Sequence, residues 1–178
     1  MTRKVAFLDR DGTINVDHGY VHKTTDWEFT KDAIHALRRL TDFGFAIAVV
    51  TNQSGIASGR YSSADVDQLH EFMQLTLENL GVEIDAIAVC PHHQDDRCKC
   101  RKPQLGLAAD VQQQLNEDIE YAASWTIGDK LSDIEFGRKL GTHTALIRSR
   151  YWNELELDSD STLVVESLSE AVDQIVST

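Results

Sequence analysis

Short apolar runs alternate with amphipathic stretches along the chain. The runs lie at residues 5–8, 46–50, 84–89, 124–127 and 144–147. Each run is brief and mostly apolar at consecutive positions, which is typical of a strand buried on both faces of a parallel sheet. The pattern therefore predicts strands at these positions, each separated from the next by enough chain for a helix.

The intervening segments have helical periodicity, and their ends carry helix-terminal residues. Gly44 follows the first segment, where a left-handed residue commonly ends a helix. Ser62 and Asp65 form the pattern of a capping box, and Ser132 with Glu135 repeats its spacing. The predicted helices cover residues 32–43, 62–80, 106–115 and 132–141, and the tail at 163–176 is expected to add a short strand and a last helix.

Repeated strand–helix alternation predicts a doubly wound α/β fold with a parallel sheet and right-handed crossovers. A chain of 178 residues suits one domain spanning 1–178, because chains of this size bury roughly 70% of their unfolded surface. Ligands of such sheets bind beyond the carboxyl ends of the strands. Polar clusters follow four of the predicted strands, at residues 9–13, 51–54, 90 onward and 128–130.

These clusters carry the groups needed for chemistry on a phosphate ester. Asp9 and Asp11 flank Arg10 at the first strand end, so one carboxylate could be a nucleophile and the other could move a proton. A carboxylate that attacks a phosphate dianion is repelled by roughly 4 kcal/mol per charge pair at about 4 Å and an effective dielectric constant near 20. Mg²⁺ shared by Asp9 and Asp129, together with Lys102, would offset that repulsion.

The segments "FLDRDGT", "VVTNQ", "RKP" and "IGDKLSD" resemble the four motifs of the haloacid dehalogenase superfamily of phosphohydrolases. The resemblance implies that Asp9 forms an aspartyl-phosphate, and that Asp11 protonates the leaving oxygen and later activates water. It further implies that Thr51 and Lys102 hold the phosphoryl group. The implied Mg²⁺ ligands are Asp9, Asp129 and the backbone carbonyl of Asp11. Asp133 is left open between a helix N-terminal charge and a group behind these ligands.

Many members of this superfamily carry a cap domain over the active site, but the spacing of the motifs here leaves no room for one. Between Asp11 and Thr51 lie 39 residues, and between Thr51 and Lys102 lie 50. The predicted helices occupy most of both intervals. We therefore expect a capless protein, whose site is enclosed by its own loops at 15–29 and 90–103.

All three cysteines lie within residues 90–100. The pattern C-x-H-x₅-C-x-C offers three thiolates and one imidazole, a tetrahedral set suited to a structural Zn²⁺. A disulfide or free thiols are the competing interpretations, but a C-x-C disulfide would be strained. The spacing allows either histidine to bind, and the resemblance favours Cys90, His92, Cys98 and Cys100 over a set with His93. Such a site would staple the loop and hold Arg101 and Lys102 in place.

The zinc loop and the segment "INVDHGYVHK" resemble a capless branch of the superfamily that acts on heptose bisphosphate or on histidinol phosphate. The segment favours heptose bisphosphate, a precursor of nucleotide-activated heptose. The five residues between His92 and Cys98 are closer to the histidinol type, so that substrate stays the alternative. Arg101 could read a second phosphate, or could pair with Asp95 or Asp96. The implied substrate contacts are Asp17, His18, Gly19, Tyr20, Asn52, Gln53, Ser54, Arg101 and Lys130.

Net charge and composition limit the partners. With 17 basic and 29 acidic residues the net charge is −12, which opposes binding to nucleic acid or anionic membranes. A DNA 3′-phosphatase is disfavoured on this ground, and a phosphoacceptor module without turnover is disfavoured by Asp11. The absence of a targeting segment and the clustered thiols predict a cytoplasmic protein. We expect a monomer that acts on a small phosphorylated sugar.

Overall fold

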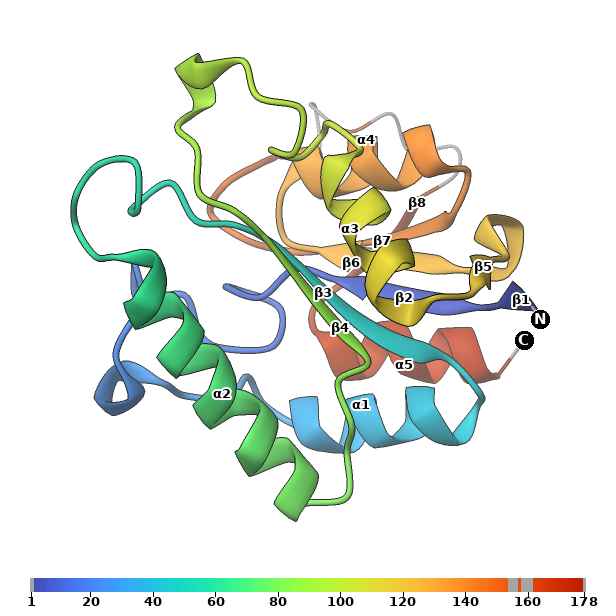
Figure 1. Cartoon of the computed structure of the whole chain (residues 1–178). Coiled ribbons are helices and arrows are strands. Elements are labelled where there is room, and N and C mark those ends of the chain that lie inside the picture. The colour runs from blue at the N-terminus through green and yellow to red at the C-terminus, as the bar shows by residue number, and fades with distance from the viewer. Residues whose placement is uncertain (1, 154–156, 158–161, 178) are drawn as a thin grey trace.

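A parallel sheet of six strands runs through the centre of the protein, in the order β4-β3-β2-β6-β7-β8 (Figure 1). The computed structural model describes residues 2–153, 157 and 162–177. The strands are β2 (Val5–Leu8), β3 (Ala46–Asn52), β4 (Ala86–Cys90), β6 (Trp125–Gly128), β7 (His143–Ile147) and β8 (Thr162–Val165). The predicted doubly wound α/β fold is confirmed. Two short strands that periodicity does not predict, β1 (Thr2–Arg3) and β5 (Asp118–Ile119), pair with each other in a separate sheet.

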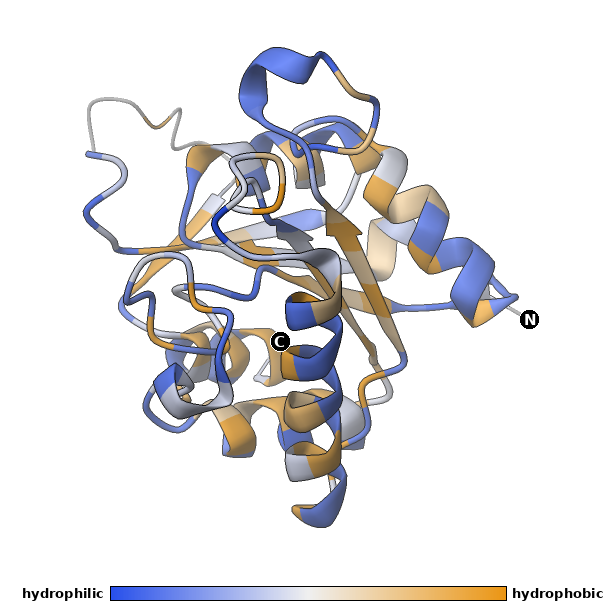
Figure 2. Ribbon diagram, turned by 60° about the vertical axis from the view of Figure 1, so that its left-hand side comes forward, coloured by the Kyte–Doolittle hydropathy of each residue, from blue (hydrophilic) through white to orange (hydrophobic). Residues whose placement is uncertain are grey.

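Helices cover both faces of the sheet. On one face lie α1 (Ala33–Asp42), α2 (Ser63–Asn79) and α5 (Leu168–Val176), and on the other α3 (Gly106–Leu115) and α4 (Leu131–Leu140). Successive strand residues point to opposite faces, so Ala6 and Leu8 pack into the first layer and Val5 and Phe7 into the second. Hydrophobic residues accordingly fill the central strands, whereas the helices mix both kinds (Figure 2). Short 3₁₀ turns lie at η1 (Thr24–Asp26), η2 (Gln94–Asp96) and η3 (Tyr121–Ala123).

The predicted capping box begins α2. Ser62 Oγ accepts the N–H of Asp65 at 3.1 Å, and the Asp65 carboxylate accepts the N–H of Ser62 at 2.8 Å. The hydrogen bonds that the N–H and the hydroxyl of Ser62 donate to the Asp65 carboxylate lower the pKa of Asp65. Two backbone donors that the helix itself cannot satisfy are thereby paired.

The predicted start of α4 is wrong. The helix begins at Leu131, and the Asp133 carboxylate accepts the N–H of Lys130 at 3.0 Å. Glu135 instead forms an ion pair with Lys139 at 2.9 Å, one turn further along the helix. The helix thus begins one residue before the predicted start, and Asp133 takes the capping role that was predicted for Glu135.

The strand order reverses between β2 and β6, which makes their carboxyl ends the topological switch point. Asp9 follows β2 and Asp129 follows β6, so the two carboxylates flank this point. The loops after β3 and β4 rise at the same end of the sheet (Figure 1). Of the helices described, none is long and apolar enough to cross a membrane.

Replacing the α2 cap should weaken the fold measurably. We expect Ser62→Ala to lower the free energy of unfolding by about 1 kcal/mol, because the N–H of Asp65 loses its acceptor. Urea denaturation monitored by circular dichroism measures the change. Ser63→Ala, one residue further along, is the matched control, and an equal loss in both variants would contradict a specific capping role.

Candidate active site

A buried ion pair lies at the carboxyl end of β2. All four residues of this strand are buried, and Asp9 directly after it is 5% exposed. Lys102 Nζ donates to Asp9 Oδ1 at 2.9 Å and to the carbonyl oxygen of Val50 at 2.7 Å. The same ammonium lies 2.6 Å from Asp133 Oδ1. Burial acts to raise the pKa of Asp9, but Lys102 and Lys130 outweigh it and keep this pKa below its usual range. The two ammonium groups therefore favour the ionised form of Asp9.

Asp9, Asp129 and Asp133 form a compact acidic group, with one oxygen of each carboxylate within 4.8 Å of the others. Burial and the charge of Asp9 raise the pKa of Asp129 to about 7. Lys130 Nζ bridges the group, at 3.1 Å from Asp129 Oδ1 and 3.7 Å from Asp9 Oδ2. When all three carboxylates are ionised, the two ammonium groups leave one negative charge uncompensated. Buried oxygen donors with excess negative charge fit a hard divalent cation.

Two glycines of the motifs allow these carboxylates to approach the backbone. Gly12 has a φ of +86°, and a Cβ atom there would lie 2.3 Å from Asp129 Oδ2. At Gly128 a Cβ atom would lie 2.2 Å from Asp133 Oδ2. Any side chain at either position would displace a carboxylate of the acidic group. Packing alone therefore explains why both positions are glycine, because the carboxylates leave no room for a Cβ atom.

Asp11 lies beside Asp9 but is held by different partners. Arg10 Nη2 donates to both of its carboxylate oxygens at 2.9 Å, and Asn15 Nδ2 donates to Oδ1 at 3.0 Å. Gln53 Nε2 donates to Asp11 Oδ2 at 2.9 Å and to the buried hydroxyl oxygen of Thr51 at 2.8 Å. Gln53, predicted only as a substrate contact, therefore also orients two of the predicted catalytic residues.

A pocket of about 320 Å³ opens above these groups. Of the predicted substrate contacts it is lined by Asp17, Gly19, Tyr20, Asn52, Gln53, Ser54, Arg101 and Lys130. His18 is not among the lining residues. Its Nε2 lies 3.1 Å from Glu28 Oε2, and it borders a separate cavity formed by residues 18–28. The fold therefore brings all the predicted contacts except His18 to one pocket.

Asn52 also fastens the loop that carries Lys102. Its side chain accepts the N–H of Lys102 at 3.0 Å and donates to the Lys102 carbonyl oxygen at 3.3 Å. The guanidinium of Arg101 donates to the His92 carbonyl oxygen at 3.3 Å, so the alternative pairing with Asp95 or Asp96 is not the one observed. Arg101 still lines the pocket, where its charge faces any bound anion.

Tyr151 lines the pocket and was missed from the sequence. Its hydroxyl donates to Asp17 Oδ2 at 2.5 Å, and Lys130 Nζ lies 4.6 Å from the centre of its ring. Tyr151 follows β7, so it too comes after the carboxyl end of a strand. Extending the strand-end argument to this fifth strand would have found it. Tyr61 and Ser132 also line the pocket without a sequence signal of their own.

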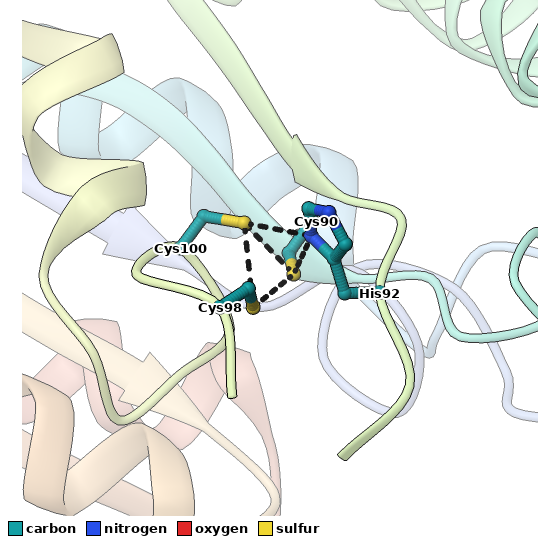
Figure 3. A group of neighbouring side chains, drawn as sticks. All are labelled: Cys90, His92, Cys98 and Cys100. Carbon is teal, nitrogen blue, oxygen red and sulfur yellow. Dashed lines mark hydrogen bonds between the residues drawn. The ribbon is translucent and has the colours of Figure 1, made fainter. Parts of the chain in front are cut away.

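The three cysteines and His92 converge in the loop after β4 (Figure 3). Cys100 Sγ lies 3.1 Å from Cys90 Sγ and 3.2 Å from His92 Nδ1, and Cys98 Sγ lies 3.7 Å from both other sulfurs. Ligands of a tetrahedral ion with bonds of about 2.3 Å lie roughly 3.7 Å apart, so the four donors could hold one metal ion. His93 instead pairs with Asp95 at 3.2 Å.

A hydrogen bond joins the cluster to the segment of the loop that carries Lys102. The main-chain N–H of Arg101 donates to Cys98 Sγ at 3.3 Å, which ties the residue before Lys102 to the sulfur group. Burial raises the pKa of the Cys90 thiol. A neutral thiol is a poor ligand, and a bound cation is what favours the thiolate. The donor set therefore fits a metal that also anchors the loop.

The buried Asp9–Lys102 pair, the acidic group and the capless sheet define a phosphatase of the haloacid dehalogenase superfamily. The family described as polynucleotide kinase 3 phosphatase matches residues 4–146, and the chain belongs to it. Two similar relatives are both named D-glycero-β-D-manno-heptose-1,7-bisphosphate 7-phosphatase. The one from Photorhabdus laumondii is 42% identical over 173 residues, which cover 92% of this chain and 90% of the relative. The one from Escherichia coli K12 is 46% identical over 136 residues, or 72% of this chain and 70% of the relative.

Solved structures agree with this assignment. The D,D-heptose 1,7-bisphosphate phosphatase from B. bronchiseptica, complexed with magnesium and phosphate, superposes with a TM-score of 0.86. It is 30% identical, and the match covers 98% of both chains. The corresponding enzyme from Burkholderia thailandensis gives a TM-score of 0.72 at 26% identity, over 99% of this chain and all of that one.

The two adjacent histidines of the loop provide a sharp test of the metal cluster. We expect His92→Gln to reduce bound metal severely, because the ion loses its single imidazole ligand. His93→Gln should retain it, since His93 contacts Asp95 outside the cluster. Elemental analysis of the purified variants measures the ratio of metal to protein. Equal metal content in both would show that His92 is not a ligand.

Proposed function

We propose that this protein removes the phosphate at carbon 7 of D-glycero-D-manno-heptose 1,7-bisphosphate. The observation that carries the proposal is the buried Asp9, paired with Lys102, next to a pocket lined by Asp17, Gly19 and Tyr20 of the 15–29 loop. Relatives that cover nine-tenths of the chain are named for this reaction. Asp17 and Tyr20 offer an acceptor and a hydroxyl for a polyhydroxy substrate. Arg101 offers a planar fork for the phosphate at carbon 1.

The reaction begins with Asp9. One of its carboxylate oxygens attacks phosphorus, the bond between phosphorus and the carbon-7 oxygen breaks, and an aspartyl-phosphate forms. Asp11 gives its proton to the leaving oxygen. In the second step Asp11 takes a proton from water while the water oxygen attacks phosphorus, and the bond between phosphorus and the Asp9 oxygen breaks. Inorganic phosphate leaves, and both carboxyl groups return to their starting states.

Positive groups around Asp9 make this attack feasible. Lys102 and Lys130 contact Asp9 directly. The Thr51 hydroxyl, at the end of β3, is buried and accepts a hydrogen bond from Gln53, and it does not line the pocket. Asp9, Asp129 and the backbone carbonyl of Asp11 would hold Mg²⁺. When bound, this ion supplies positive charge against the phosphoryl oxygens. Asp133 is held by two contacts within the protein. Its carboxylate pairs with Lys102 and accepts the N–H of Lys130.

The metal of the loop cluster is Zn²⁺ in this proposal, bound by Cys90, His92, Cys98 and Cys100. All four coordination positions are filled by protein atoms, so the ion has a structural role. It keeps the loop in the register that places Lys102 against Asp9. A displacement of about 1 Å at a catalytic group can cost a hundredfold in rate, which explains the need for a rigid anchor.

Substitution of the two aspartates should separate their roles. We expect Asp9→Asn to abolish turnover, because an amide cannot attack phosphorus. Asp11→Asn should lower kcat by about 10²–10⁴-fold with a much smaller change in KM, because proton transfer is lost while binding remains. Phosphate release under saturating and limiting substrate measures both constants. Asp110→Asn, an exposed carboxylate on α3, is the control. Wild-type turnover by Asp9→Asn would end the covalent mechanism.

A substrate panel tests the specificity. We expect the heptose 1,7-bisphosphate to give the highest kcat/KM, with either anomer at carbon 1 supplied separately. Histidinol phosphate and a 3′-phosphorylated oligonucleotide are the competing substrates, and the net charge of −12 disfavours the second. Faster turnover of histidinol phosphate or of the oligonucleotide would overturn the proposed substrate, although not the phosphatase chemistry.

A further inference from the structure

Arg10 lies between the two catalytic aspartates in sequence, yet its side chain is fully buried. It is the largest completely buried side chain among the described residues and does not line the pocket. Its guanidinium contacts three separate parts of the chain. These are Asp11, the carbonyl oxygen of Val21 in the 15–29 loop, and His70 on α2.

A buried guanidinium destabilises a protein unless its N–H groups are paired. Nη2 donates to both oxygens of Asp11 at 2.9 Å and to Val21 O at 2.6 Å, and Nε lies 3.3 Å from Asp11 Oδ1. Nη1 lies 3.1 Å from His70 Nε2. Because Nη1 can only donate, His70 Nε2 must be the unprotonated, accepting nitrogen.

The environment of His70 keeps its ring neutral. The side chain is 5% exposed, and burial together with the charge of Arg10 lowers its pKa to about 3. The fully buried guanidinium of Arg10 needs a hydrogen-bond acceptor without positive charge, and the neutral ring of His70 provides one. The ring lies on the inner side of α2, a helix whose capping box fixes its first turn.

The guanidinium is planar, so fixing one of its nitrogens fixes the direction of the others. His70 holds Nη1, and the opposite edge, Nε and Nη2, meets the carboxylate of Asp11. The orientation of Asp11 thus depends on His70, which lies 60 positions from Arg10 along the chain. Through Val21 O, the same group ties the 15–29 loop to Asp11.

We propose that Arg10 and His70 are positioning residues, which orient the Asp11 carboxylate for proton transfer to the leaving oxygen. This inference rests on the acid–base role of Asp11 in the proposed function. Neither residue touches the substrate. His70 acts on the reaction through Arg10, and Arg10 acts through Asp11.

Proton donation matters more for a poor leaving group than for a good one. An alkoxide needs its proton as the bond to phosphorus breaks, whereas a nitrophenolate leaves without one. A misplaced Asp11 should therefore slow hydrolysis of an alkyl phosphate far more than hydrolysis of p-nitrophenyl phosphate. Loss of folded protein would reduce both rates by the same factor.

Two substitutions at His70 separate the hydrogen bond from the volume of the ring. His70→Leu removes the acceptor, and we expect kcat/KM for heptose bisphosphate to fall by about 10- to 100-fold, part of the full contribution of proton transfer. For p-nitrophenyl phosphate the fall should be less than about threefold. His70→Gln keeps an accepting oxygen and should restore most of the alkyl phosphate activity. His35→Leu, on the exposed side of α1, is the control for removing a histidine.

The test of the positioning role is the comparison of the activity losses for heptose bisphosphate and p-nitrophenyl phosphate. Equal losses for the two substrates in His70→Leu, or no recovery in His70→Gln, would overturn the positioning role. Asp11→Asn is measured beside them as the reference. If Asp11→Asn itself shows no dependence on the leaving group, the proposed acid–base chemistry fails. If it shows the dependence and His70→Leu does not, only the role of Arg10 and His70 fails.

Discussion

The ion pair between Asp9 and Lys102 is the interaction on which the site depends. Both side chains are almost completely buried, and a buried charge is tolerated only when a partner and further hydrogen bonds compensate its lost hydration. Lys102 meets this requirement with Asp9, Asp133 and the Val50 carbonyl oxygen. The three acceptors come from the ends of β2, α4 and β3, so the ammonium joins the strands and helix that surround the switch point.

The position of Lys102 against Asp9 depends on the loop that carries it, and two groups of contacts hold this loop. Asn52 pairs with both main-chain groups of Lys102, and the Cys₃His cluster lies two residues upstream. Within this loop η2 contains no buried residue, and the three cysteines are the side chains that pack into the hydrophobic core. Hydrogen bonds and the packing of the Cys₃His cluster therefore hold this loop in place.

Much of this arrangement follows from local pattern. The apolar runs predicted the central strands, and the carboxyl-end rule brought Asp9, Thr51, Lys102 and Asp129 to one edge. The cap of α4 was mispredicted because Ser132 and Glu135 have the spacing of a capping box, whereas in the folded chain the Asp133 carboxylate accepts the N–H of Lys130. His18 lies beside the pocket instead of lining it, because the backbone turns at Gly19 and Tyr20, both with positive φ.

The sequence by itself determined the alternation of strands and helices, the edge that carries the site, and the three cysteines of the metal cluster, but it left the choice between His92 and His93 to the tertiary structure. Each of these depends on spacing along the chain, which the sequence displays directly. The tertiary structure decided which groups touch: Lys102 with Asp133, Arg10 with His70, and Tyr151 with Asp17. These contacts join residues from 31 to 134 positions apart. Sequence periodicity does not predict these contacts, because they depend on how the helices, strands and loops pack together and on which buried charges then lie close to one another.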